Sequence, residues 1–224
     1  CDCAIMARLF KYSPPQNPLE IIHIDSSIIV LNKPPGLLTV PGKSTSHFDS
    51  LLTRIRKEVF GALLVHRLDL DTSGIIIFAR TASSQVFLNK QFENQRVEKT
   101  YLARVKGHIN EDEGKIDLPI IVDWPNRPIQ KVCFLTGKRS ITSYTVLKRE
   151  INNISRVQLK PVTGRTHQLR LHMKSIGHPI IGDPLYADEG TFRISNRLEL
   201  HSLRLQITHP KTNKLITFFS SVPF

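Results

Sequence analysis

Cysteine is scarce in this chain of 224 residues, and its placement argues against a disulfide-stapled fold. Cys1, Cys3 and Cys133 are the three cysteines, and they include no second pair at the spacing of metal ligands. So few thiols fit a reducing compartment, and we expect a cytoplasmic protein. Long apolar runs are also lacking: stretches such as 75–79 are too short to cross a bilayer. We therefore expect no membrane segment.

Acidic residues are in the minority. The chain has 31 Lys and Arg residues against 19 Asp and Glu residues, which gives a formal net charge of +12 at pH 7. A surface potential of that sign attracts polyanions, so nucleic acid is the first candidate partner. An anionic membrane surface is the second candidate, but the sequence contains no basic amphipathic helix with bulky apolar residues opposite.

Segments typical of strands outnumber segments typical of helices. Short apolar or alternating runs predict strands at 20–24, 28–31, 63–65, 74–79, 99–106, 142–147, 154–160, 198–208 and 215–219. Amphipathic runs predict helices that begin at Ser46, where Asp49 has capping-box spacing, at Thr81 and at Thr166. The proline-rich stretch 118–130 predicts irregular structure. This order indicates an α+β fold with a largely antiparallel sheet and a few helices on it.

No linker composition divides the chain into separate units. We therefore predict an N-terminal arm at residues 1–20, which include the proline-rich YSPPQNP, and a single domain at 21–224.

Three common site patterns are excluded by their spacing. Gly36 and Gly42 enclose five residues before Lys43, whereas a phosphate-binding P-loop needs four. His167 and His172 are five residues apart, so they do not share a helix face as a zinc pair would. No serine stands in a G-x-S-x-G elbow. We predict no metal site.

The segment HRLDLDTSG (66–74) contains two acidic residues, Asp69 and Asp71, close to the basic Arg67, and it lies between two apolar runs. A carboxylate at the floor of a cleft needs a cationic partner and hydrogen bonds to stay ionised. On local chemistry alone, Asp69 and Asp71 are equal candidates for a catalytic acid. A structural turn with a capping aspartate is the competing interpretation.

A second segment, VTGRTHQLRLHMKSIGHP (162–179), combines basic residues with a predicted helix. Arg165 comes just before the helix, whose free amides favour anions. Arg170 and Lys174 are four residues apart and would share a face as phosphate contacts. A solvated helix face is the alternative.

Together these segments resemble the RluA family of pseudouridine synthases. The family signature HRLD-x-x-TSG is matched at 66–74, and its segment TGR-[TS]-HQLR-x-H is matched at 163–172, followed by GHPIIGD at 177–183. The strand that bears Tyr101 is similar to the family's tyrosine segment. The resemblance runs from about residue 21 to the end of the sequence. It implies a bilobed, mostly antiparallel mixed sheet with flanking helices and a central cleft.

The resemblance also implies a reaction and its residues. Uracil would be detached from its ribose, rotated and rejoined through carbon 5, without cofactor or metal. Asp69, and not Asp71, matches the catalytic aspartate, with the choice between nucleophile and base left open. Arg165 is the candidate that pairs with it and keeps it charged. Tyr101 matches the tyrosine that stacks on the base.

RNA contacts are implied as well. A target uridine in a stem-loop must flip out of the stack to be reached, and Arg67 would fill the vacated place. His66, Arg170 and Lys174 are the further candidates for contact with RNA.

The segment DWPNRPIQKVC (123–133) and the chain length are similar to a dual-specificity member of the family. This implies 23S ribosomal RNA and transfer RNA anticodon stem-loops as partners of a monomeric enzyme. Because about 20 residues precede the catalytic region, we expect no S4 RNA-binding module. A non-catalytic RNA-binding protein and an RNA hydrolase are the alternatives.

Overall fold

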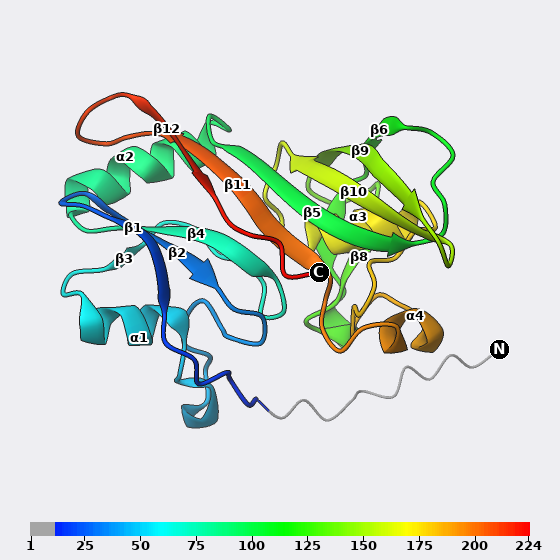
Figure 1. Ribbon diagram of the computed structural model, residues 1–224, viewed down its shortest axis with the longest axis horizontal. Coiled ribbons are helices and arrows are strands. Elements are labelled where there is room, and N and C mark those ends of the chain that lie inside the picture. The colour runs from blue at the N-terminus through cyan, green and yellow to red at the C-terminus, as the bar shows by residue number, and fades with distance from the viewer. Residues whose placement is uncertain (1–11) are drawn as a thin grey trace.

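A ten-stranded sheet runs through the molecule in the computed structural model, which describes residues 12–224 (Figure 1). The strand order is β1-β2-β4-β11-β5-β10-β9-β6, with β3 beside β4 and β12 beside β11. These strands are β1 (Glu20–Ile24), β2 (Ile28–Lys33), β3 (Leu63–Leu64), β4 (Ser73–Ala79), β5 (Glu98–Lys106), β6 (Glu113–Asp117), β9 (Ile141–Glu150), β10 (Ile154–Pro161), β11 (Leu200–Thr208) and β12 (Leu215–Phe219). The predicted strands and the α+β class are confirmed. Part of the predicted N-terminal arm, residues 1–11, lies outside the described residues.

Four α-helices flank the sheet in the described part of the chain. They are α1 (Leu51–Glu58), α2 (Ala82–Glu93), α3 (Gln168–Ser175) and α4 (Glu189–Arg193), with 3-10 turns η1 (Thr45–His47) and η2 (Trp124–Asn126). A separate two-stranded sheet pairs β7 (Ile120–Val122) with β8 (Gln130–Val132). Within residues 12–224, no helix combines the length and the apolar character needed to cross a membrane.

The two halves of the main sheet meet at a short parallel seam. β4 and β11 pair through Ser73 with His201 and through Gly74 with Ser202, and the other pairings among the described strands are antiparallel. Gly74 has a φ of 108°, and a Cβ atom built on it would lie 2.3 Å from the Ser202 carbonyl oxygen. Glycine is therefore required here, because any side chain would push the two halves apart.

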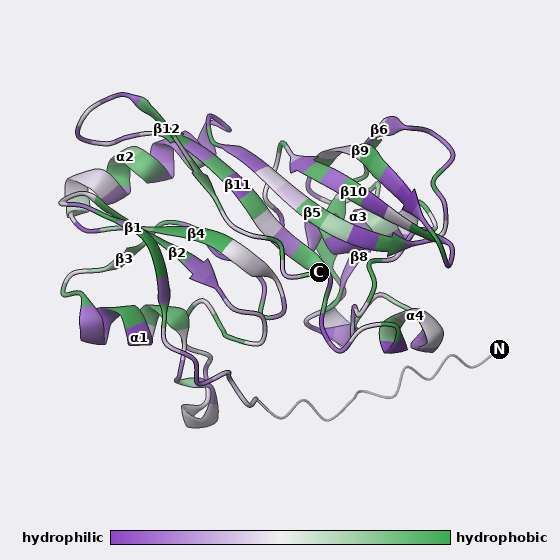
Figure 2. Ribbon diagram, viewed as in Figure 1, coloured by the Kyte–Doolittle hydropathy of each residue, from purple (hydrophilic) through white to green (hydrophobic). Residues whose placement is uncertain are grey.

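Each face of the sheet carries its own apolar core because side chains alternate along a strand. On β4, which is hydrophobic over most of its length (Figure 2), Ile76 and Phe78 pack with α1 and α3 on one face. Ile75 and Ile77 pack on the other face with Leu88 of α2. This double burial explains why 75–79 is a continuous apolar run instead of an alternating one.

Two local predictions were wrong. The first helix does not begin at Ser46: α1 begins at Leu51, where the Ser50 hydroxyl accepts from the Thr53 amide and the Thr53 hydroxyl accepts from the Ser50 amide. The stretch 118–130, predicted to be irregular, contains the β7–β8 hairpin. Its apolar side chains pack against Leu171 and Tyr186, which are distant in sequence.

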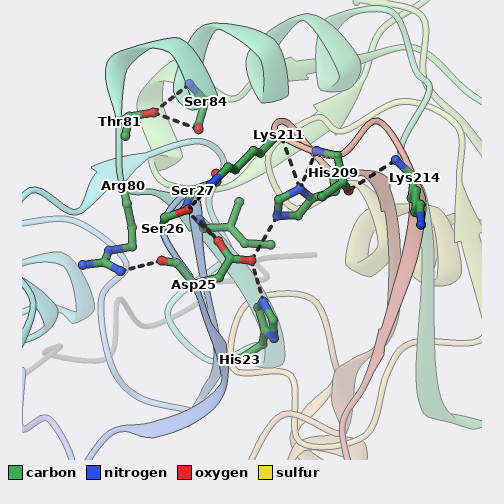
Figure 3. Close-up of polar contacts among 12 residues, drawn as sticks. His23, Asp25, Ser26, Ser27, Arg80, Thr81, Ser84, His209, Lys211 and Lys214 are labelled. Atoms are coloured by element: carbon green, nitrogen blue, oxygen red, sulfur yellow. Dashed lines mark hydrogen bonds and ion pairs between the residues drawn. The ribbon is translucent and has the colours of Figure 1, made fainter.

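Asp25 ties together three turns at one end of the sheet (Figure 3). Its Oδ1 accepts from the amides of Ser27 and Ile28 at 2.7 and 3.0 Å. Its Oδ2 accepts from the Nε2 atoms of His23 and His209 at 2.8 and 3.0 Å. Burial opposes ionisation, but these four hydrogen bonds hold the pKa of Asp25 well below its ordinary value.

The tautomer of His209 follows from its other ring nitrogen. His209 Nδ1 accepts from the amides of Lys211 and Thr212 at 3.2 and 3.1 Å, so in the neutral ring the proton is on Nε2 and points at Asp25. The carboxylate thus joins the β1–β2 turn to the β11–β12 turn. Arg80, after β4, donates to the Asp25 carbonyl.

We predict that Asp25→Ala lowers the free energy of unfolding by about 1–3 kcal/mol, because several donors lose their acceptor. Urea denaturation at pH 7 measures it. Asp112→Ala is the control, since that side chain is 82% exposed and forms a surface ion pair with Arg149 worth about 0–1 kcal/mol. Because the folded-state pKa of Asp25 is lowered, its contribution is present above the unfolded-state pKa of about 4 and is lost progressively as the pH falls from there through the folded-state pKa. Equal losses in the two variants would contradict this role.

Candidate functional site

The loop that bears Asp69 lies between β3 and β4 and leads directly into the seam of the sheet. The Asp69 side chain is 25% exposed, whereas Leu68 beside it is buried. The Thr39 hydroxyl donates to the Leu68 carbonyl at 2.7 Å and accepts from the Leu68 amide at 3.3 Å. Asp69 is therefore presented to solvent from a backbone that is held on its inner side.

Lys33, at the end of β2, holds the same loop from the interior. Its ammonium donates to the carbonyl oxygens of Pro34, Leu37 and Leu70 at 2.9, 2.7 and 2.8 Å, which uses all three of its N–H groups. The side chain is fully buried, and burial lowers the pKa of Lys33 to about 7 against the opposing effect of the nearby aspartates. Leu70 is thereby fixed between Asp69 and Asp71.

Arg170, in the first turn of α3, is the cation that faces Asp69. Its Nη1 lies 3.8 Å from Asp69 Oδ2, and its Nε and Nη2 donate to the two carboxylate oxygens of Asp183 at 2.8 and 2.6 Å. Arg170 is 2% exposed and Asp183 is fully buried. Burial opposes the charge of Arg170, but the carboxylates of Asp183, Asp69 and Asp71 outweigh it and raise its pKa. The guanidinium is therefore a permanent positive charge beside Asp69.

A second layer of contacts orients Arg170. Asp183 Oδ1 also accepts from the amides of Leu185 and Tyr186, and the Tyr186 ring lies 5.3 Å from the Arg170 guanidinium. The Tyr186 hydroxyl accepts from the Gln130 amide at 2.8 Å and is 2.9 Å from His167 Nδ1, to which it can donate. Burial lowers the pKa of His167, which favours the neutral ring that accepts this bond.

The environments of Asp69 and Asp71 differ. Burial raises the pKa of Asp71, although Arg170 and Lys33 oppose the shift. Asp69 instead combines partial exposure with an ion pair to Arg170. Of the two carboxylates, Asp69 is therefore the one that is both partly exposed and ion-paired with Arg170.

Tyr101 lies in β5, between Ser202 of β11 and Leu159 of β10. Its side chain is buried in the core cluster on the α1–α3 face. Burial raises the pKa of Tyr101 to about 12, and nearby Asp69 contributes in the same direction. At neutral pH the phenol therefore keeps its proton, which disfavours a role as a general base.

Two predictions about the 163–174 segment require correction. Arg165 is exposed, and the described contacts include no ion pair between it and Asp69; Arg170 has the pairing role predicted for Arg165. Arg170 is also too buried to form a phosphate-binding face with the exposed Lys174. Arg170 instead turns inward to the buried Asp183. The helix α3 begins at Gln168 and not at Thr166, after the left-handed backbone of His167 with φ of 53°.

The other predicted RNA contacts fall on different surfaces. Arg67 is exposed beside Asp69. His66 instead packs inward: its Nε2 accepts from the Ile77 amide at 3.1 Å, and its ring stacks on Phe92 with centroids 4.5 Å apart. Burial, with a smaller effect from Lys99, lowers the pKa of His66 to about 3. A neutral, hydrogen-bonded ring at this position supports the loop and is a poor phosphate contact.

Sequence reasoning missed the roles of Asp183 and Lys33. Asp183 is the last residue of GHPIIGD, and Lys33 precedes the Pro34-Pro35-Gly36 turn. An acid next to a glycine-proline loop and a lysine at a strand end were available signals, but neither indicates by itself that its side chain is buried.

For metal binding, residues 12–224 contain no group of three or more His, Cys, Asp or Glu side chains placed to hold an ion.

Comparison with known proteins shows which proteins this chain is similar to. The family model described as RNA pseudouridylate synthase matches residues 27–175. The chain is 50% identical over 209 residues to the dual-specificity RNA pseudouridine synthase RluA of Salmonella typhi, with 93% of this chain and 95% of that protein covered. It is 49% identical over 215 residues to the protein of the same name from Escherichia coli strain K12, with 96% and 98% covered.

Solved structures agree with the sequence matches. Human RNA Pseudouridylate Synthase Domain Containing 1 superposes with a TM-score of 0.77 at 28% identity, over 95% of this chain and 87% of that one. Human RNA Pseudouridylate Synthase Domain Containing 4 superposes with a TM-score of 0.74 over 91% and 88%, and its 23% identity supports the fold alone.

We predict that Arg170→Met lowers the free energy of unfolding by about 3–5 kcal/mol, because it leaves a buried carboxylate without its cation. Chemical denaturation at pH 7 measures the change. Arg165→Met is the matched control from the same segment: its side chain is exposed, so the expected change is within about 0.5 kcal/mol. A stability loss in Arg170→Met no larger than in the control would contradict the bridging role.

Proposed function

The chain belongs to the RNA pseudouridylate synthase family, and we propose that it isomerises uridines in both ribosomal and transfer RNA at the Asp69 site. It is an isomerase that converts uridine in RNA to pseudouridine. One observation supports the dual substrate range. About half of the residues, across nearly the whole chain, are identical to those of enzymes named dual-specificity RNA pseudouridine synthases. We assign residues 21–224 to one catalytic domain.

Asp69 is the proposed catalytic residue. Cleavage of the glycosidic bond needs either a nucleophile or a base beside the ribose, and a carboxylate serves in either role only while it is ionised. The Arg170 guanidinium, at 3.8 Å, places a positive charge beside this carboxylate. Partial exposure of Asp69 leaves it open to the substrate, whereas Asp183 holds Arg170 in place from the buried side.

Tyr101 is proposed to pack against the uracil ring as a neutral phenol. Its position in the central strand β5 and its raised pKa, about 12, support a contact that needs no ionisation. In this role the aromatic face supports the base while it is detached and rotated.

Arg67 is proposed to take the place of the flipped uridine in the RNA stack. It is exposed and adjacent in sequence to the buried Leu68, so its backbone is anchored while its planar guanidinium is free to stack on neighbouring bases. Lys174, exposed on the last turn of α3, is proposed as a phosphate contact. Stem-loop substrates, a monomeric state and a cytoplasmic location stay predictions.

Release of tritium from 5-tritiated uridine tests the function, because isomerisation must expel the carbon 5 proton. We expect the protein to release tritium from a 23S ribosomal RNA stem-loop and from a transfer RNA anticodon stem-loop. Release from one RNA alone would narrow the substrate range. Binding without release from either would leave a non-catalytic RNA-binding protein, and shortened RNA on a denaturing gel would indicate a hydrolase.

We predict that Asp69→Asn lowers the rate of tritium release by a factor of about 10²–10⁴ or more while fold and RNA binding are kept. The amide has the size of the carboxylate but cannot act as an ionised nucleophile or base. Asp71→Asn is the matched control and should lose far less activity, because the carboxylate of this loop that forms an ion pair with Arg170 is that of Asp69. Equal losses would remove the preference for Asp69.

We predict that Arg67→Ala impairs turnover of folded stem-loop RNA without lowering the melting temperature of the protein. Loss of the stacking guanidinium should mainly raise KM for the stem-loop, since the flipped state is no longer stabilised. Arg165→Ala, another exposed arginine, is the comparison. If thermal melting shows that Arg67→Ala unfolds the protein, the proposed role of Arg67 in base flipping loses its support.

A further inference from the structure

Trp124 is the single tryptophan of the chain, and it is 64% exposed. It begins η2, the turn that connects β7 to β8. A large aromatic side chain left in water in this way has no packing role to explain it. An indole left exposed in this way can serve as a stacking surface for a planar partner.

A cation lies on the indole ring. The Arg127 guanidinium carbon is 4.4 Å from the centre of the Trp124 ring, within the range of a cation–π contact. The described ion pairs include none for Arg127. The nearby acid Asp123 is already bound by Lys131 and Asn126, at 3.1 and 2.8 Å. The pair therefore presents an aromatic face with an uncompensated positive charge, which suits a nucleobase and its phosphate.

The turn that carries this pair is held in shape. The Ile129 amide donates to the Asn126 carbonyl at 3.0 Å, and the amides of Asp123 and Asn126 donate to the carbonyls of Ile129 and Asp123 at 2.9 Å each. Ile129 also packs in the apolar cluster with Leu171 and Tyr186. A platform fixed in this way loses little conformational entropy when a base stacks on it.

The platform is joined to the wall of the Asp69 site. β8 lies beside α3 (Figure 1), and the Gln130 amide donates to the Tyr186 hydroxyl. Tyr186 in turn lies under Arg170, the partner of Asp69. Val122 pairs with Gln130, and two residues of extended chain, at most about 7 Å, separate Val122 from Trp124.

We propose that Trp124, with Arg127 on its ring, stacks on an unpaired nucleobase of the RNA whose target uridine is bound at Asp69. The proposal rests on the proposed function and adds a second contact, outside the reacting nucleotide. RNA is the expected ligand because the flat indole ring can stack on a base, and the arginine on it, which has no ion pair among the described residues, can contact the phosphate.

The intrinsic fluorescence of Trp124 tests the stack directly, since no other tryptophan contributes. Titration of the wild-type protein with an anticodon stem-loop should quench the emission, with the dissociation constant found by filter binding. A fully paired duplex of equal length, which offers no unpaired base, should quench far less. Binding of the stem-loop without a change in emission would overturn the proposal.

A variant series provides the second test. Trp124→Ala should raise KM for the stem-loop by about 5- to 150-fold, the effect of losing one base–aromatic stack, with kcat changed little, and Trp124→Phe should recover most of the loss. Phe134→Ala is the control: Phe134 is 77% exposed just beyond the other end of β8, and the described contacts place no cation on its ring. Equal losses in Trp124→Ala and Phe134→Ala would overturn the specific platform.

The failure of this proposal can be told apart from failure of the proposed function. Tritium release by the wild-type protein tests the function without reference to Trp124. If tritium is released but Trp124→Ala keeps the wild-type KM, the platform is wrong and the function stands. If no tritium is released yet the stem-loop quenches Trp124, the platform stands as part of an RNA-binding protein.

Discussion

The structure depends on one buried charge network, in which Arg170 lies between Asp183 and Asp69. An arginine that is 2% exposed costs several kcal/mol to desolvate unless its donors are satisfied. Asp183 satisfies two of them in a bidentate arrangement, and the remaining side of the guanidinium faces Asp69. Arg170 is thus held by two hydrogen bonds to Asp183, and the candidate catalytic carboxylate of Asp69 lies against the same positive charge.

This arrangement requires two distant parts of the sheet to meet. Arg170 and Asp183 follow β10, whereas Asp69 precedes β4, and the two sides join through two residue pairs of a parallel seam. Gly74 makes that contact possible because no Cβ atom fits against the Ser202 backbone. Lys33 holds the loop from below through three carbonyl groups, so that both the loop and its counter-charge are fixed before RNA binds.

Much of the fold and part of the site could be predicted from the sequence. Alternating and continuous apolar runs predicted the main strands, and the bounds of 20–24 and 215–219 agree with those of β1 and β12. The Thr81 cap of α2 was also correct. The two motif segments, 66–74 and 162–179, pointed to the loop of Asp69, and the family resemblance that they carried was confirmed. These features are local, since periodicity, caps and motifs are written in neighbouring residues.

Tertiary structure decided the rest. Arg165 and Arg170 are the same residue type five positions apart, and only the position of Asp183 distinguishes Arg170 as the buried partner of Asp69. The β7–β8 hairpin likewise depends on packing against Leu171 and Tyr186. Residue types and spacing determine which groups are available, but burial and charge pairing come from long-range contacts. Those contacts set which groups are desolvated, and therefore which carry charge.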